Sequence, residues 1–219
     1  MVNRPAHNPP QQARSRESHR RLLDAVETVL DKYGLEGATL PRIAAEAGLS
    51  PASVYRRFRD KDALVRAVFG RSSEVRKEEN ANEVNPEELR KIGIRNFVGN
   101  WITAMIKAFR TRTGLIRATV LYAQQHPKAA FVSRQRDLEI QGFHKMVETF
   151  LIWRDEIRHP APEQAVKFAM GMVAFALREL ILFNQVQMFK ELVPVDDDHL
   201  QMELSRMFLR YLGAEPDSR

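Results

Sequence analysis

Apolar residues recur every three or four positions along most of this chain, and no stretch alternates between apolar and polar residues as half-buried strands do. Proline and capping residues separate the periodic segments, as at Asn85-Pro86 and His126-Pro127. We therefore predict an all-α protein of about nine helices. The expected helices cover residues 21–33, 39–47, 51–58, 61–80, 85–109, 113–125, 127–158, 162–189 and 199–212.

The segment 39–64 contains two short helical patterns joined by a glycine. Thr39 is placed to cap the first helix, and Gly48 can adopt the left-handed conformation in which helices often end. Ser50 then caps the second helix, and Pro51 occupies its first turn, where a missing N–H costs nothing. This order of cap, glycine, cap and proline predicts a helix-turn-helix.

The second of these helices has one apolar and one polar face. Val54 and Phe58, four residues apart, are expected to hold it against the domain core. Small and polar residues on the free face suit a helix that enters the major groove of DNA, where an arginine can bind guanine O6 and N7. The residues expected to point outward are Ala52, Ser53, Tyr55, Arg56 and Arg57.

Positive charge gathers in the same segment. Between residues 49 and 61 there is only one acidic residue, Asp60, against four basic ones: Arg56, Arg57, Arg59 and Lys61. The chain carries a formal charge of +6, which favours a polyanionic partner. The four charges alone would suit a helical hairpin with a solvated basic face. Together with the ordered caps, however, they favour DNA binding.

The run from Arg21 to Phe69 resembles the amino-terminal domain of the TetR family of bacterial transcriptional regulators. The resemblance rests on a first helix that stops at Tyr33-Gly34, the core I-A-A-E-A-G-L-S, the segment Y-R-R-F and the helix start K-D-A-L. Arg57 departs from the family pattern, in which histidine or tyrosine is common beside the phenylalanine.

The resemblance also implies a role for each residue of the motif. It implies phosphate contacts for Thr39, Ser50, Tyr55 and Lys61, and base-edge contacts for Ala52, Ser53 and Arg56. The full predicted DNA-contacting set is Thr39, Arg42, Ser50, Ala52, Ser53, Tyr55, Arg56, Arg57 and Lys61.

The chain divides into a tail (residues 1–13), a helix-turn-helix domain (14–70) and a helical body (71–219) for effector binding and dimerisation. The tail is rich in proline, asparagine and glutamine and is expected to be disordered. The basic stretch A-R-S-R-E-S-H-R-R follows. It is either the solvated start of the first helix or an arm that lies along the phosphate backbone or in the minor groove.

The helix expected at 162–189 is apolar on more than one face, which indicates a place at a domain centre or at a contact with a partner. It resembles, together with the last helix, the helix pair that forms the four-helix dimer interface of the TetR family. The resemblance implies a homodimer whose interface includes Phe168, Met172, Leu180, Phe183, Leu204, Phe208 and Tyr211. It also implies a small-molecule cavity for an apolar or aromatic effector, and the candidate lining is Trp101, Met105, Phe109, Tyr122, Phe143, Met146, Phe150, Met170 and Phe175.

Composition and the absence of several motifs narrow the functional classes to which this protein can belong. The chain has no cysteine, no phosphate-binding glycine loop, no G-x-S-x-G and no H-E-x-x-H, so we expect no enzyme activity and no cofactor. We expect no metal site either, and the acidic run 196–198 is expected to cap the last helix. The sequence lacks a membrane-spanning apolar run and the apolar core of a signal peptide, which favours the cytoplasm.

These patterns predict a TetR-like transcriptional regulator, specifically a repressor that binds a palindromic operator as a dimer and is released by a small hydrophobic effector. The alternative is a helical ligand-binding or interaction protein without specific DNA binding, whose basic third is only a solvated surface. A second alternative is a constitutive DNA-binding scaffold that has lost its ligand.

Overall fold

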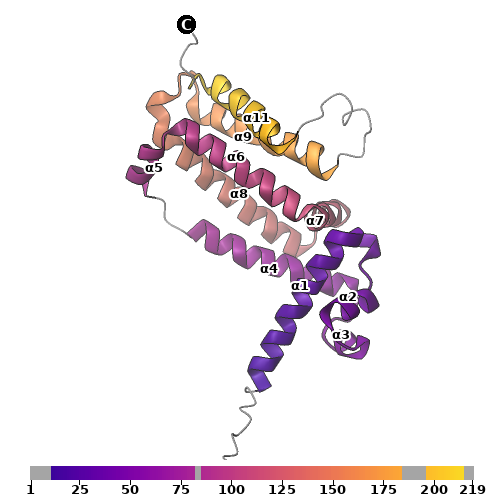
Figure 1. Ribbon diagram of the computed structural model, residues 1–219. Coiled ribbons are helices and arrows are strands. Elements are labelled where there is room, and N and C mark those ends of the chain that lie inside the picture. Colours follow the sequence, from indigo (N-terminus) through magenta and orange to yellow (C-terminus); the bar gives the residue numbers. More distant parts are fainter. Residues whose placement is uncertain (1–10, 82–84, 184–195, 215–219) are drawn as a thin grey trace, which may run out of the picture.

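The computed structural model describes residues 11–81, 85–183 and 196–214, and every regular element in these ranges is helical (Figure 1). The all-α prediction is confirmed. The α-helices are α1 (Gln11–Gly37), α2 (Leu40–Ala47), α3 (Pro51–Arg57), α4 (Lys61–Ala81), α5 (Pro86–Ile92), α6 (Ile94–Thr111), α7 (Thr113–Gln125), α8 (Ala130–Phe150), α9 (Pro162–Leu177) and α11 (Asp197–Leu212). A 3₁₀ segment, η1 (Leu151–Glu156), follows α8, and a π-helical segment, η2 (Arg178–Leu182), follows α9.

Two of the predicted helices are interrupted in the structure. The helix expected from residue 85 is divided into α5 and α6 by Gly93, whose φ of +77° is left-handed and interrupts the helix. The helix expected to reach residue 158 changes to 3₁₀ geometry after Phe150. The end expected near residue 189 lies outside the described residues, as do residues 1–10 of the predicted tail; Gln11 already belongs to α1.

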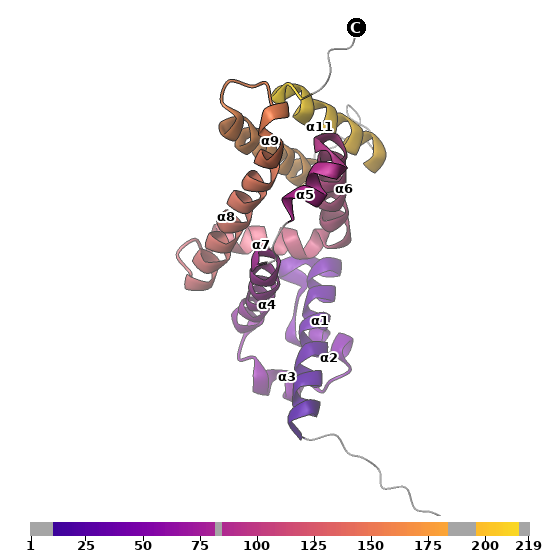
Figure 2. The ribbon, with the colours of Figure 1, turned by 90° about the vertical axis from the view of Figure 1, so that its left-hand side faces the viewer.

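The helices form two groups along the length of the molecule (Figures 1 and 2). The first group comprises α1, α2, α3 and the start of α4. It encloses a small core in which Leu22, Val29, Ile43, Val54 and Leu64 are almost completely buried. Gly34 has a φ of +66° and ends the regular part of α1, as the Tyr33-Gly34 pattern predicts. This core fixes α2 and α3 against the side of α1.

The second group forms a helical body from α5, α6, α8, α9 and α11. Its core is aromatic at the centre, because the buried ring of Phe150 contacts three others. The ring centroids of Phe97, Trp101 and Phe208 lie 5.0, 5.5 and 5.1 Å from that of Phe150. Edge-to-face and tilted contacts at these distances add to the burial of apolar area.

Two helices connect the groups. Helix α4 runs through the domain boundary predicted at residue 70 and packs along α8, while α7 packs along α1. The carboxylate Oδ1 of Asp31 in α1 accepts hydrogen bonds from the backbone amides of Gly114 (2.7 Å) and Leu115 (3.4 Å), and so caps α7 from 83 residues away. A Cβ at Gly114 would lie 2.1 Å from the Asp31 carbonyl oxygen, so only glycine permits this approach. The amino-terminal group is therefore attached to the body through α7 as well as through α4.

Candidate nucleic-acid interface

Helix α2 begins and ends where the capping residues predict. Thr39 has extended backbone angles, and its hydroxyl accepts a hydrogen bond from the backbone amide of Arg42 at 3.4 Å. Gly48 ends the helix in the left-handed conformation, with φ 63° and ψ 35°. Ile43, Ala44 and Ala47 are buried, so the apolar face of α2 packs on the core.

Helix α3 is built in the same way. The Ser50 hydroxyl accepts from the Ser53 backbone amide at 3.3 Å, and Pro51 opens the helix. Val54 and Phe58 are buried and anchor α3 to the core, as their spacing predicts. The opposite face of α3 is left free.

The outward face of α3 carries a mixture of small, aromatic and basic side chains. Tyr55 is 51% exposed, and Ala52, Arg56 and Arg57 are also exposed. The Ser53 hydroxyl lies 2.9 Å from that of Ser50 and accepts from Nη2 of Arg56 at 3.3 Å. These contacts hold Arg56 along the helix, with its remaining guanidinium donors available to a ligand.

The structure separates two other basic residues of the predicted set from this face. The guanidinium of Arg42 donates to the carbonyl oxygen of Gly37 at 2.7 Å and lies 4.3 Å from the centroid of the Tyr33 ring. It is thus engaged by its own chain. Lys61 is the first residue of α4, which Asp60 caps, and its side chain lies outside the described residues.

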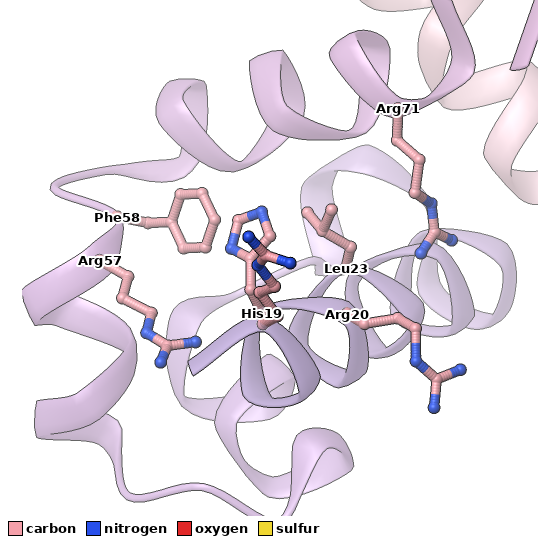
Figure 3. Close-up of a pocket in the computed structure, with 7 residues that line it drawn as sticks. His19, Arg20, Leu23, Arg57, Phe58 and Arg71 are labelled. Atoms are coloured by element: carbon pink, nitrogen blue, oxygen red, sulfur yellow. The ribbon is translucent and has the colours of Figure 1, made fainter. Parts of the chain in front are cut away.

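Arg57 lies apart from Arg56, on the side of α3 that faces α1. There it lines a cavity of about 640 Å³ together with residues of α1 and α4 (Figure 3). Sequence reasoning singled out the basic stretch at the start of α1 but did not place it beside α3. Only the tertiary fold, in which α1 and α3 both pack on α2, brings the two to one cavity.

The predicted effector-pocket residues fall into three places. Most of them surround the aromatic core of the body: Phe150 and Met170 are buried, and the partly buried ones are Trp101, Met105, Phe109, Phe143 and Met146. Tyr122 instead belongs to a separate cluster with Phe69 at the junction of α4 and α7. Phe175 is 62% exposed on the outer face of α9, so it is set apart from the other aromatic residues.

The predicted dimer-interface residues also differ in their exposure to solvent. Phe168, Met172 and Tyr211 are exposed, and the rings of Phe168 and Tyr211 lie 5.4 Å apart across α9 and α11. Leu180 and Phe183 are partly buried. Leu204 and Phe208, in contrast, pack inside the subunit because the inner face of α11 covers α6 and α9. Two further residues, Phe175 and Met207, extend the exposed surface, which we call the α9–α11 face (Phe168, Met172, Phe175, Met207 and Tyr211).

Tyr122 connects the two groups of helices through a buried hydroxyl. The side chain is 4% exposed, and burial raises its pKa to about 12; the Asp62 carboxylate in the first turn of α4 adds to this rise, because its negative charge favours the protonated phenol. His126 stacks on the Tyr122 ring with centroids 4.3 Å apart. A second cavity of about 450 Å³ opens beside this contact, between Tyr33 of α1 and Gln125 of α7.

Three further observations concern the described residues. They contain no group of three or more histidine, cysteine or acidic side chains placed to hold a metal ion. The Asp196 carboxylate accepts from the His199 amide at 2.7 Å and caps α11, as the sequence predicts. None of the described helices is long and apolar enough to cross a lipid bilayer.

The capped turn, the anchored helix α3 and its exposed basic face define a helix-turn-helix DNA-binding protein. Residues 22–68 match the family model described as "Bacterial regulatory proteins, tetR family". The chain therefore carries the DNA-binding domain of the TetR family, which confirms the resemblance, and this family consists of transcriptional regulators and not of enzymes.

Comparisons with individual proteins agree with this assignment. An uncharacterised HTH-type transcriptional regulator of Bacillus subtilis, YvkB, is 36% identical over 61 residues, which are 28% of this chain and 32% of that protein. The match thus spans about a third of the length of that relative.

Solved structures extend the similarity of fold to the body. A TetR-family regulator from Mesorhizobium loti has a TM-score of 0.59 at 18% identity, covering 94% of this chain and 98% of that one. The regulator FadR from Bacillus subtilis, solved in complex with stearoyl-CoA, has a TM-score of 0.55 at 12% identity, covering 90% of this chain and all of that one. At such identities the likeness shows the fold.

Proposed function

We propose that this chain is a ligand-responsive repressor that binds a palindromic operator as a homodimer. The observation that carries the proposal is α3 itself, anchored by two buried side chains and presenting Tyr55 and Arg56 to solvent at one end of the molecule. In the major groove, Arg56 reads a guanine, while the hydroxyl groups of Thr39, Ser50 and Tyr55 bind phosphates. A regulator of this kind acts where the DNA is, in the cytoplasm.

The α9–α11 face supports the homodimer. Phe168 and Phe175 are 56% and 62% exposed, and large aromatic side chains gathered on one face usually mark a protein contact. A two-fold axis that lies in this face and runs parallel to the length of the molecule would place the two copies of α3 on the same side of the dimer. Paired recognition helices then read two half-sites one helical turn, or a multiple of it, apart.

The aromatic core of the body supports a hydrophobic effector. Partly buried side chains such as Trp101, Phe109 and Phe143 pack against the core that contains Phe150, and an apolar environment with few polar groups suits an apolar ligand. The complex of FadR with stearoyl-CoA shows that the same fold accepts a long acyl chain in another protein. We therefore propose an apolar or aromatic effector for this chain.

The contacts of α4 and α7 with α1 support a mechanism by which effector binding changes DNA binding. Movement of α7 within the body would reach α1 through the Asp31 cap, and movement of α4 would reach it through the ion pairs of Arg71 with Asp24 and Glu27. Either shift changes the distance between the two copies of α3. Thermodynamic linkage requires that the effector binds the non-operator conformation better, and that DNA weakens effector binding by the same factor.

The first experiment is a selection of bound duplexes from a random pool with the purified protein at moderate salt. We expect a palindrome with half-sites about one turn or more apart. A pool without a shared sequence, and binding that disappears on addition of salt, would favour the helical interaction protein instead. With the palindrome in hand, a panel of acyl chains and aromatic compounds is screened for release of the duplex, and a regulator that responds to none is the constitutive scaffold.

A further inference from the structure

The cavity between α1 and α3 has the chemistry of a phosphate-binding site. It measures about 640 Å³ and lies beside the end of the recognition helix (Figure 3). Its lining residues come from α1, the end of α3 and α4, and none of them is acidic. They are Arg16, His19, Arg20, Leu23, Arg57, Phe58 and Arg71.

The four arginines of the cavity are not equivalent. Arg71 pairs with Asp24 at 2.5 Å and with Glu27, and Arg20 pairs with Glu17 at 2.9 Å, so the charge of these two is compensated. Arg16 and Arg57 have no hydrogen bond or ion pair with any described residue. Two uncompensated guanidinium groups, 41 residues apart in the sequence and on different helices, therefore border one cavity. Such groups bind phosphate oxygens with pairs of parallel hydrogen bonds.

The remaining wall of the cavity is apolar and flat. The rings of His19 and Phe58 stack with centroids 6.2 Å apart and an angle of 22° between their planes, and Leu23 lies next to them. A basic rim over an apolar wall matches the two parts of a nucleotide backbone unit. The phosphate is anionic, and the deoxyribose presents carbon atoms.

The position of the cavity beside α3 indicates that the phosphate it binds belongs to the DNA backbone. Arg57 is the last residue of α3, so a duplex whose major groove holds α3 has its sugar–phosphate backbone next to Arg57 and the start of α1. We propose that this cavity binds a backbone phosphate at the flank of the operator half-site, with Arg16 and Arg57 as its donors. The inference rests on the proposed function, and it gives the basic start of α1 a role as a helical phosphate clamp.

The test uses duplexes in which one phosphate at a time is replaced by an uncharged methylphosphonate, on the operator recovered by selection. For the wild-type dimer we expect one position at each half-site flank where the replacement weakens binding. For Arg16→Gln and Arg57→Gln we expect weaker binding to the unmodified duplex but no further loss at that position. The slope of log K against log salt becomes shallower by about 0.9 for each phosphate contact removed.

Three variants make the result specific. Arg90→Gln removes the same charge from the exposed surface of α5, far from α3, and is expected to leave the affinity and the methylphosphonate profile unchanged. Arg16→Lys keeps the charge and is expected to restore most of the salt slope. Arg56→Ala is expected to lose base discrimination while it keeps the sensitivity to the flank phosphate, since its contact is to a base.

The outcomes separate the inference from the function on which it rests. If the operator is bound and Arg56→Ala impairs selectivity, but no phosphate position couples to Arg16 or Arg57, the phosphate clamp is wrong and the regulator stands. If no operator is recovered, the proposed function itself fails. A third arm measures binding of a mononucleotide to the protein alone by calorimetry. Saturable binding that Arg57→Gln abolishes, without coupling to any DNA phosphate, would assign the cavity to a free ligand and overturn the proposal.

Discussion

The two ends of this molecule expose side chains of opposite character. The helix-turn-helix end presents Tyr55, Arg56 and Arg57 on a short helix, whereas the α9–α11 face presents Phe168 and Phe175 on a long one, α9. The first surface suits a charged, hydrated duplex, because arginine and hydroxyl groups exchange water for phosphate and base edges at little cost. The second gains free energy only when another apolar surface covers it. The same chain thus separates recognition of DNA from recognition of itself.

The two ends also differ in how they are constructed. At the helix-turn-helix end, each cap bonds a residue three positions away, as Thr39 does with Arg42 and Ser50 with Ser53. On the α9–α11 face, exposure depends on which side of each helix the rest of the body covers. Phe208 and Tyr211 are three residues apart in α11, yet the first is buried and the second exposed. A local motif therefore defines one surface, and the long-range packing defines the other.

The largest effect is expected from acidic residues on the α9–α11 face. In Phe168→Glu/Phe175→Glu, two charges replace exposed apolar rings, so the subunit remains folded but no longer pairs. Sedimentation equilibrium is expected to show a monomer, and affinity for the palindrome falls by roughly 10²–10⁴-fold because the two half-sites are no longer linked. Ile140→Glu introduces a charge at an exposed apolar position of α8 and is the matched control. A double variant that remains a dimer would remove this face from the interface.

The next effect concerns the junction between the two ends. Gly114→Ala places a Cβ against the backbone of Asp31, and α1 and α7 must separate to admit it. We expect a loss of unfolding free energy of about 3 kcal/mol, measured by urea denaturation. Gly70→Ala in α4 meets no atom within 4 Å and is expected to stabilise the protein by about 0.5–1 kcal/mol instead. Equal responses of the two variants would mean that α1 and α7 do not depend on this contact.

Within the helix-turn-helix end, substitutions of Arg56 and Arg42 test which of the two arginines contributes to base discrimination. Arg56→Ala is expected to lose about 1–3 kcal/mol of discrimination between the operator and a duplex changed at one guanine. Arg42→Ala is expected to retain that discrimination, because the Arg42 guanidinium is already bonded to Gly37 and stacked on Tyr33. Fluorescence anisotropy with the two duplexes measures both. A loss confined to Arg42→Ala would reverse the assignment.

The smallest effect is expected at Tyr122. Its pKa is raised to about 12 in the folded protein, so folding favours the protonated phenol, and the stability that it contributes is complete below pH 10. That stability is lost as the pH rises from 10 to 12. Tyr122→Phe removes the phenol hydroxyl and its interaction with Asp62, and is expected to cost about 1 kcal/mol at pH 8. The difference in unfolding free energy between wild type and variant, measured from pH 8 to 12, should therefore shrink as the pH increases. A constant difference would show that ionisation of Tyr122 is not linked to folding.

The all-α fold, the helix-turn-helix and the identity of its anchors could be predicted from the order of residues alone. These features depend on interactions within a few residues, such as the Ser50 cap and the Val54–Phe58 spacing, and they do not require knowledge of the neighbours. The end of the regular part of α1 at Gly34 and the cap of α11 at Asp196 were predictable for the same reason.

Contacts between residues far apart in the chain, in contrast, depend on how the helices pack. Asp31 caps α7 across 83 residues, and Arg16 joins Arg57 at one cavity only because α1 and α3 both pack on α2. The assignment of Phe208 to the core and Phe175 to the surface likewise depended on which helices cover each face. A one-dimensional pattern records that a residue is apolar or charged, but burial and pairing are properties of several helices together, and their relative placement is set by packing over the whole chain.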